Sequence, residues 1–312
     1  MSFFTYLRHA ILCIIAILKP SVSLNLSIIS FTEAFSPLYG NQNVIPSNDG
    51  NSVQISMNQW LTSGSGFVSQ YAYNHGFFIA SIKLPNNTYT AGVVATFYAQ
   101  NNDSNRDEID FEFLGHIEGE GWILQTNLYG NGSIHKGREE RYRLPFDPSK
   151  DFHDYGILWT TNRVIFFVDE CAIREVVNVK EMGGDFPSKP MYMYGTMWDG
   201  SDWATHDGKY RVDFEYGGFD TEYTRFVMDG CRVDSFFQPE CYADIPSGIN
   251  ATERTRMDVY RGQYMIYSYC LDTDRYPISL PECEVIDEDM QPISAPIGAP
   301  PNMVSGASRR FR

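Results

Sequence analysis

The sequence lacks the motifs by which nucleotide-dependent and zinc-dependent proteins are recognised. No glycine-rich phosphate loop lies between an expected strand and an expected helix, and no Cys/His cluster has zinc-site spacing. His153, in the segment KDFHDY, has no neighbour at metal-ligand or catalytic-triad spacing, so we interpret it as a structural residue. We therefore expect no cofactor and no metal ion.

Basic residues are scarce. The 312 residues include 24 Lys and Arg against 39 Asp and Glu, which gives a formal net charge of −15 at pH 7. An acidic surface of this kind repels phosphate backbones, so we expect no nucleic-acid partner. A neutral polymer would not be repelled.

Long apolar runs are limited to one segment, from Ala10 to Leu18. This run is too short to span a bilayer. Arg8 before it and the small residues Ser21 to Ser23 after it are typical of a secretory signal peptide. We expect residues 1–23 to be a signal peptide and the protein to be secreted, without a membrane anchor.

Cysteine is sparse, with six in the chain, and Cys13 belongs to the expected signal peptide. Four more gather late in the chain, in a compartment that permits disulfides: Cys231, Cys241, Cys270 and Cys283. Four cysteines allow three pairings, among which the sequence does not choose, although pairing of neighbours along the chain is the simplest. Cys171 is left over, and its apolar, strand-like surroundings indicate a buried, inert thiol.

Long amphipathic helices are not indicated between Ser30 and Asp229. Short runs rich in Val, Ile, Phe, Tyr and Thr alternate there with Gly, Asn and Pro turns. This pattern predicts an all-β fold, an antiparallel β-sandwich or jelly roll whose concave sheet can hold an extended ligand. We assign residues 24–229 to this domain.

The pattern changes after Asn250, which with Glu253 resembles a capping box. Four apolar or aromatic residues then recur at helical spacing: Met257, Tyr260, Tyr264 and Tyr267. We expect residues 230–285 to form a short disulfide-stapled extension that contains one helix. Residues 286–312, rich in Pro, Gly, Ser and Ala, are expected to be a disordered tail.

Acidic residues are concentrated in one segment, RDEIDFEFLG from Arg106. Glu108, Asp110 and Glu112 occupy alternate positions there, with Ile109, Phe111 and Phe113 between them. Read as a strand, the segment places three carboxyls on one face and three apolar side chains on the other. Because stacked like charges repel, the acidic face must meet solvent or a cleft.

Two carboxyls four residues apart on a strand suit a particular chemistry. Their Cα atoms lie about 13 Å apart, and side chains that converge can shorten this separation. Retaining glycosidases need about 5 to 5.5 Å between a nucleophilic carboxylate and a general acid. A solvated strand face and a helix are the alternatives, but the period of two disfavours the helix, and three acids in a row favour catalysis.

Glycosylation sequons occur at five positions, which fits a secretory route: Asn25, Asn86, Asn102, Asn131 and Asn250. Asn131 is the best candidate, because the turn YGNGS follows an expected strand and would keep a glycan outside.

The acidic strand resembles the signature HDEIDFEFLG of the xyloglucan endotransglucosylase/hydrolases of plant cell walls, in glycoside hydrolase family 16. Further similar segments run in the family's order over most of residues 60 to 283: GSGFVS from Gly64, YTAGVVATFYAQ from Tyr89, LQTNLYGNGS from Leu124, GREERYRL from Gly137, DPSKDFHDYGILWT from Asp147, FFVD from Phe166, GGDFPSKPM from Gly183, WDGSDWAT from Trp198 and YSYC from Tyr267. The long tail and two of these segments are similar to the divergent third group of that family.

The resemblance implies a concanavalin-like jelly roll with an open cleft. It implies Glu108 as nucleophile, Asp110 as its helper, and Glu112 as general acid and then base. It also implies four residues that bind sugar, two by hydrogen bonds and two by flat aromatic faces that cover apolar sugar faces: Gln125, Asn127, Trp198 and Trp203. For each tryptophan, buried packing is an equally favoured alternative.

The implied activity is cleavage of xyloglucan and transfer of the fragment to another xyloglucan chain or oligosaccharide, in the cell wall or apoplast, by a monomer. Hydrolysis is the alternative outcome, since water can replace the acceptor. Arg106 stands where the family has His, and its fixed charge would favour ionised Glu108 or its longer side chain would obstruct the sugar. A catalytically impaired glycan-binding protein is therefore the rival hypothesis.

Overall fold

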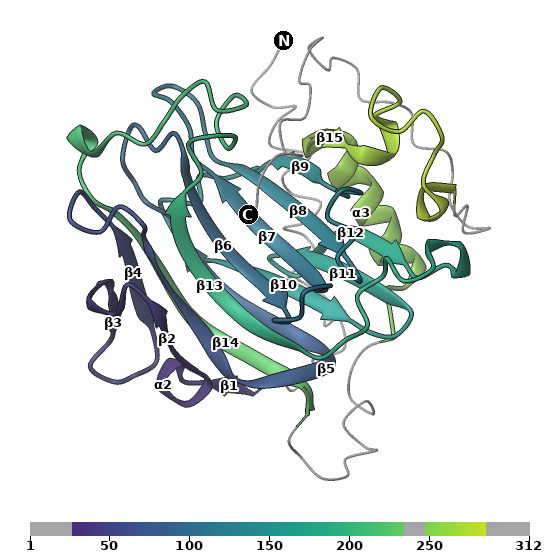
Figure 1. Cartoon of the computed structure of the whole chain (residues 1–312), viewed down its shortest axis with the longest axis horizontal. Coiled ribbons are helices and arrows are strands. Elements are labelled where there is room, and N and C mark those ends of the chain that lie inside the picture. Colours follow the sequence, from purple (N-terminus) through teal and green to yellow (C-terminus); the bar gives the residue numbers. More distant parts are fainter. Residues whose placement is uncertain (1–26, 234–246, 285–312) are drawn as a thin grey trace.

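The computed structural model describes residues 27–233 and 247–284. Within them the chain is mostly antiparallel β-sheet, with a helix in the C-terminal extension (Figure 1). The predicted fold class is confirmed. The expected signal peptide and the expected disordered tail lie outside the described residues.

The strands are β1 (Ile28–Ile29), β2 (Phe35–Tyr39), β3 (Val44–Pro46), β4 (Val53–Met57), β5 (Ser65–Lys83), β6 (Val93–Gln100), β7 (Glu108–Leu114), β8 (Ile123–Tyr129), β9 (Glu140–Arg143), β10 (His153–Trp159), β11 (Arg163–Val168), β12 (Cys171–Val177), β13 (Met191–Asp199), β14 (Phe219–Arg232) and β15 (Met265–Ser268). The helices are α2 (Phe31–Ala34) and α3 (Ala251–Tyr264). Short 3₁₀ turns cover Asn41–Asn43, Lys180–Met182, Phe214–Tyr216, Tyr269–Leu271 and Pro281–Glu284.

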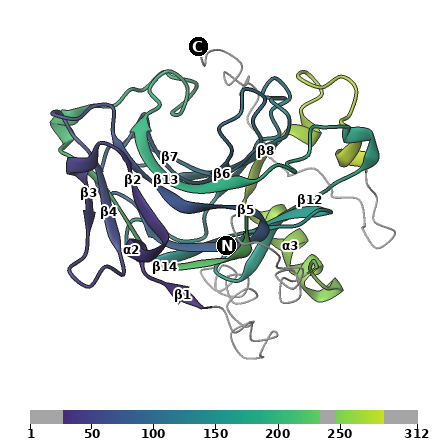
Figure 2. The same cartoon turned by 60° about the horizontal axis from the view of Figure 1, so that its bottom comes forward.

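Strand β5 links the two layers of the sandwich. Its first half pairs with β2 and β13, and its second half pairs with β10 and β14. One layer therefore runs β2, β5, β13, β6, β7, β8, β9 and β15, and the other holds β12, β11, β10, β5, β14, β4 and β3. Figure 2 shows β6, β7 and β8 in one layer, with β14 and β12 in the other. Strand β7 lies in the middle of the first layer.

The core forms between the layers from the apolar positions of the alternating strands. Phe111 of β7 contacts Tyr155 and Phe166 of the facing sheet edge to face, with ring centroids 5.8 and 5.1 Å apart. Ile109, Phe111 and Phe113 are all fully buried. The apolar half of the acidic motif therefore fixes which face of β7 the carboxyls occupy.

Helix α3 begins as the sequence predicts. The side chain of Asn250 accepts hydrogen bonds from the backbone N–H groups of Thr252 and Glu253, and the Glu253 side chain accepts one from the N–H of Asn250. The predicted helical stripe was wrong at its last member, because α3 ends at Tyr264 and Tyr267 lies on β15. Among the described residues no helix is long and apolar enough to cross a membrane.

The extension is anchored on β9 by buried ion pairs. Arg261 of α3 donates to both carboxylate oxygens of Glu140, at 2.6 and 2.8 Å. Burial alone would raise the pKa of Glu140, but Arg261 and Arg174 lower it to about 2. The pair is therefore charged throughout the physiological range, which keeps α3 attached beside the strand.

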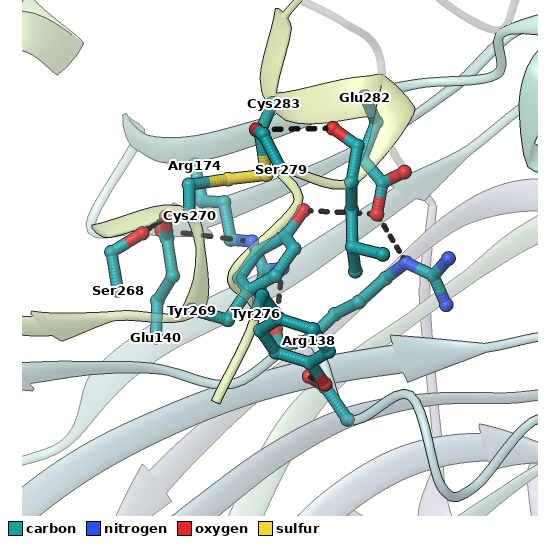
Figure 3. Close-up of a disulfide and its surroundings, with 12 residues drawn as sticks. Arg138, Glu140, Arg174, Ser268, Tyr269, Cys270, Tyr276, Ser279, Glu282 and Cys283 are labelled. Carbon is teal, nitrogen blue, oxygen red and sulfur yellow. Dashed lines mark hydrogen bonds and ion pairs between the residues drawn. A yellow bond between two sulfur atoms is a disulfide. The ribbon is translucent and has the colours of Figure 1, made fainter. Parts of the chain in front are cut away.

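Cys270 and Cys283 form a disulfide, as the simplest pairing predicts. Figure 3 shows this bond beside Glu282, whose carboxylate accepts hydrogen bonds from buried Arg138 and from the Tyr269 hydroxyl. Cys231 is also disulfide-bonded, and its expected partner Cys241 lies outside the described residues. Cys171 is buried, as expected.

Candidate active site

The structure places Glu108, Asp110 and Glu112 on one face of β7. Glu108 and Glu112 are partly exposed, whereas Asp110 is buried between them. Strands β6 and β8 flank β7, so each carboxyl has one cross-strand neighbour on either side. These neighbours decide the environment of each acid.

Glu108 is held by hydrogen-bond donors. Gln100, opposite on β6, donates its side-chain N–H to Glu108 Oε2. Arg106 Nε lies 3.4 Å from the same oxygen. The two donors hold the Glu108 carboxylate in place at the amino-terminal end of β7, where it can act as a nucleophile.

Asp110 is in the opposite situation. Burial raises its pKa well above the usual range, and the charges of Glu108 and Glu112 raise it further. Asp110 is therefore the carboxyl that keeps a proton, and it makes a side-chain hydrogen bond with Glu108. Its position lets it donate to one catalytic acid while it separates that acid from the other.

Glu112 has the properties of a general acid. Burial raises its pKa to about 7, with further increases from the charges of Glu108 and Glu139. A hydrogen bond from Gln125 Nε2 to Glu112 Oε2, 2.5 Å long, works in the other direction. A carboxyl with a pKa near neutrality can be protonated when a leaving group departs and ionised when an acceptor must lose its proton.

Gln125 is in turn oriented by Arg141. Arg141 Nε donates to Gln125 Oε1 at 2.7 Å, so the Gln125 amide must present its N–H side to Glu112. The Arg141 guanidinium lies over the ring of Tyr267 on β15, 5.7 Å from its centroid. Arg275 of the extension also holds Glu139, with Nη1 2.6 Å from Oε2. The extension thus supports the surroundings of Glu112.

Gln125→Leu is expected to lower kcat/KM about tenfold, and to shift the basic limb of its pH profile upward. The physical reason is that the lost hydrogen bond favours the ionised form of Glu112, so that its loss raises the pKa. The measurement is kcat/KM on a soluble glucan between pH 4 and 9. Gln54→Leu, on β4 of the other sheet, is the matched control, and an unmoved basic limb in Gln125→Leu would contradict this role.

A hollow of about 720 Å³ opens beside Leu114, two residues after Glu112 on the same face of β7, and its volume suits several sugar rings. It lies beyond the carboxyl-terminal end of β7 and between the loops that follow β7, β9 and β13. Residues from the sheet and from these loops line it: Leu114, Ile123, Arg141, Arg143, His116 and His206. His206 Nε2 lies 2.8 Å from Glu120 Oε2, which links two of these loops.

Two stretches of the chain match known family models. Residues 31–216 match the family model described as "Glycosyl hydrolases family 16", and residues 235–283 match the one described as "Xyloglucan endo-transglycosylase (XET) C-terminus". Two Arabidopsis thaliana relatives are the probable xyloglucan endotransglucosylase/hydrolase proteins 30 and 27. The first is 46% identical over 301 residues, covering 91% of this chain and 85% of the relative. The second is 50% identical over 277 residues, covering 86% of this chain and 82% of the relative.

The chain belongs to the xyloglucan endotransglucosylase/hydrolase family. The resemblance read from the acidic motif is therefore confirmed, and with it the assignment to the retaining enzymes of glycosyl hydrolase family 16.

Solved structures of other glycan-active proteins share the fold. The apo Crh5 transglycosylase has a TM-score of 0.52 at 22% identity. The match covers 64% of this chain and 82% of the Crh5 chain. A prokaryotic β-1,3-1,4-glucanase from a mouse hindgut metagenome has a TM-score of 0.50 at 22% identity. The match covers 64% of this chain and 96% of the glucanase chain. At these identities the likeness supports the jelly-roll fold alone.

The residues expected to bind sugar differ in how open they are. Gln125 is buried, and both ends of its amide already engage Arg141 and Glu112. Asn127 Oδ1 accepts from the backbone N–H groups of Leu128 and Arg138 at 2.9 Å, and the residue is partly exposed. Contact of either residue with sugar remains a prediction.

The two tryptophans lie on the same side of the sheet as Leu114. Trp198, on β13, is directly opposite Val94 of β6, and Trp203 follows in the next loop. Their rings are 6.0 Å apart and tilted by 40°. Each ring packs partly against apolar neighbours and keeps part of its surface open, so packing and sugar binding are compatible here.

Asn131 occupies an exposed turn directly after β8, with a positive φ of 51°. Its side-chain oxygen accepts a hydrogen bond from Asn105 at 2.7 Å. Glycosylation at this exposed turn remains a prediction. His153 pairs with Asp169 at 2.6 Å and stacks on Phe146, which fits a structural role.

Sequence reasoning missed several residues that organise the site: Gln100, Tyr129, Arg141 and Asp107. Asp107, although part of the acidic motif, points away from the cleft. It accepts backbone N–H groups of Asn131, Ser188 and Lys189 at 2.6 to 2.9 Å, which ties two loops to the start of β7. The sequence did hold a signal for this role. Asp107 is at an odd position, whereas the other three acids are at even positions and share one face of the strand.

No group of His, Cys, Asp and Glu within 27–233 and 247–284 could hold a metal ion.

Proposed function

We propose that this protein is a secreted xyloglucan endotransglucosylase. It cleaves the β-1,4-glucan backbone of xyloglucan by a retaining double displacement and passes the glycosyl fragment to another xyloglucan chain. The observation that carries the proposal is the contrast between Glu108, which is surrounded by donors, and Glu112, with its pKa raised to about 7. Two acids on one strand thereby have the two properties that the reaction requires.

In the first step, a Glu108 oxygen attacks the anomeric carbon. The carbon–oxygen bond to the departing chain breaks, and Glu112 gives its proton to that oxygen. The product is a glycosyl ester of Glu108 and an ionised Glu112. Asp110 supplies a hydrogen bond to Glu108 throughout, because it stays protonated.

In the second step, the hydroxyl of an acceptor chain enters beside Glu112, which takes its proton. The oxygen attacks the anomeric carbon, the ester bond breaks, and Glu108 leaves as a carboxylate. The hollow beside Leu114, two residues after Glu112, gives room for a branched acceptor, which supports transfer in preference to hydrolysis. The same hollow, with the partly open faces of Trp198 and Trp203, supports xyloglucan, a branched polymer, as donor and acceptor.

Secretion to the apoplast fits the disulfide between Cys270 and Cys283, since such bonds persist in oxidising compartments. Activity as a monomer and glycosylation at Asn131 complete the proposal.

The direct test mixes the purified protein with xyloglucan polymer and a fluorescently labelled xyloglucan oligosaccharide. Size-exclusion chromatography should show the label in high-mass polymer. A falling polymer mass without incorporated label would instead identify a hydrolase. A folded protein that produces neither change would remove both activities.

The rival hypothesis is a glycan-binding protein whose turnover is impaired by Arg106. The contact that favours this hypothesis is that of Arg106 with Glu108, the proposed nucleophile. Arg106→His is expected to change the transfer rate less than tenfold, because the hydrogen bond from Gln100 to Glu108 remains. Initial rates of label transfer at pH 5 to 7 provide the measurement. A gain of 100-fold or more would show that the natural protein is impaired.

A further inference from the structure

Tyr129 lies directly beside the nucleophile. It is the last residue of β8 and the cross-strand partner of Glu108, on the cleft face of the sheet. Its side chain is buried, with 4% of the residue exposed. A buried phenol hydroxyl needs a hydrogen-bond partner, so the polarity of its contacts is informative.

The hydroxyl of Tyr129 has two neighbours of opposite character. Arg106 Nε donates to the phenol oxygen at 3.1 Å, and Glu108 is also in hydrogen-bonding contact with this hydroxyl. A guanidinium only donates, so it occupies a lone pair of the phenol oxygen and leaves the O–H to point elsewhere. The Glu108 carboxylate is the acceptor within reach. Arg106 therefore sets the direction of the Tyr129 O–H bond.

The donors around Glu108 converge on one side of its carboxylate. Gln100 Nε2 and Arg106 Nε both reach Oε2, from β6 and from the residue two positions before Glu108. Gln100 and Arg106 thus anchor the carboxylate through Oε2, which limits its rotation and the direction from which it can approach an anomeric carbon.

We propose that Tyr129, oriented by Arg106, is a positioning residue that donates its O–H to the Glu108 carboxylate and directs one oxygen toward the sugar. This inference rests on the proposed role of Glu108 as nucleophile. It assigns to the pair Arg106 and Tyr129 the support of the nucleophile at the end of the motif where this chain departs from the family signature. Arg106 then contributes to catalysis through Tyr129, and its side chain is not an obstruction.

The electrostatic surroundings of Glu108 are crowded, and each neighbour has its own effect. The titratable and charged groups that face it from its own strand and from β6, β8 and β13 are Arg106, Asp110, Glu112, Tyr98, Tyr129 and Tyr194. Among them only Arg106 is a cation, and the tyrosines are neutral at physiological pH. Removal of the Tyr129 O–H therefore removes a donor to the ionised carboxylate without changing the net charge.

The test is the pH profile of label transfer for Tyr129→Phe, Arg106→Gln and the double variant. A hydrogen bond to a charged group favours the charged form, so its loss should move the acid limb of kcat/KM upward by about one pH unit in Tyr129→Phe. At pH values on the acidic side of this limb, the transfer rate of Tyr129→Phe should be about tenfold lower than that of the natural protein. The double variant should lose less than the product of the two single losses, since Arg106 acts partly through Tyr129.

The control is Tyr223→Phe, which removes another buried phenol hydroxyl. Tyr223 belongs to β14 and donates to the backbone oxygen of Thr96 at 2.9 Å. Its removal should leave the acid limb in place. A merely structural role of Tyr129 would reduce the rate by the same factor at every pH, and that result, or fully multiplicative losses in the double variant, would overturn the proposal.

A second measurement does not depend on turnover. In protein labelled with ¹³C at the glutamate carboxyls, the Glu108 resonance can be identified as the one that Glu108→Gln removes. Its titration midpoint should move upward by about one pH unit in Tyr129→Phe and stay unchanged in Tyr223→Phe. An unmoved midpoint overturns the inference even in a protein that transfers xyloglucan, whereas a protein without transfer that shows the shift would count only against the proposed function.

Discussion

Glu108→Ala is expected to abolish both transfer and hydrolysis, with kcat reduced roughly 10⁴-fold or more, because no other group can form the glycosyl ester. Asp110 cannot replace it. Burial and the neighbouring charges raise the pKa of Asp110 well above its usual range, so it stays protonated and is not a nucleophile. The measurement is initial rate with xyloglucan and labelled oligosaccharide.

The control and the chemical rescue sharpen this prediction. Glu222→Ala removes a carboxylate on β14 that pairs with Lys83 at the surface, and should change the rate less than twofold. Azide should enter the space left in Glu108→Ala and restore cleavage of an activated donor, giving a glycosyl azide of inverted configuration. Retained activity in Glu108→Ala without azide would contradict the assignment.

Glu112→Gln is expected to reduce kcat/KM by about 10² to 10⁴ on xyloglucan and to remove the basic limb of its pH profile. Glu112 must hold a proton to release the departing chain. With its pKa raised to about 7, activity of the natural protein should fall as pH rises through that value. Glutamine neither gives up nor accepts the proton, so the limb should disappear along with the rate.

Leaving-group dependence separates this role from a general loss of structure. A donor with a good aryl leaving group needs little protonation, and Glu112→Gln should cleave it at close to the natural rate in the first step. Azide should then give a product of retained configuration. A basic limb that persists in Glu112→Gln would show that another group is the acid.

The local features of this fold could be predicted from sequence because short-range patterns determine them. Alternation in the acidic motif fixes the two faces of β7, and the Asn250 and Glu253 pair fixes the start of α3. The end of α3 was harder to predict from the sequence. Tyr267 continues the helical spacing, but its backbone belongs to β15, which pairs with β9. Tertiary pairing overrides a spacing signal at such a boundary.

The carboxyls of the site could be predicted, but their supporting residues could not. Gln100 and Tyr129 face Glu108 only because of the register of β6, β7 and β8, which depends on loops of different lengths. Arg141 meets Tyr267, far away in the sequence, through the pairing of β9 with β15. One sequence contains no signal for such contacts, whereas the acids are recognisable by their repetition at alternate positions.

The contacts of the extension explain why a catalytic jelly roll carries a stapled C-terminal segment. Tyr267 contacts Arg141, and Arg275 pairs with Glu139. Arg141 and Glu139 both act electrostatically on Glu112, so the extension and the jelly roll are joined at the general acid. The buried ion pair between α3 and β9 keeps these contacts in place.

The central claim is that Glu108 forms the covalent intermediate and Glu112 serves the leaving group. A 2-fluoro xyloglucan oligosaccharide with a good leaving group slows breakdown of that intermediate, so that the protein can be digested and its peptides weighed. The account predicts one added glycosyl mass on the peptide that contains RDEIDFEFLG, with fragmentation placing it on Glu108. Attachment to Asp110 or Glu112, or complete turnover with no labelled peptide, would contradict it.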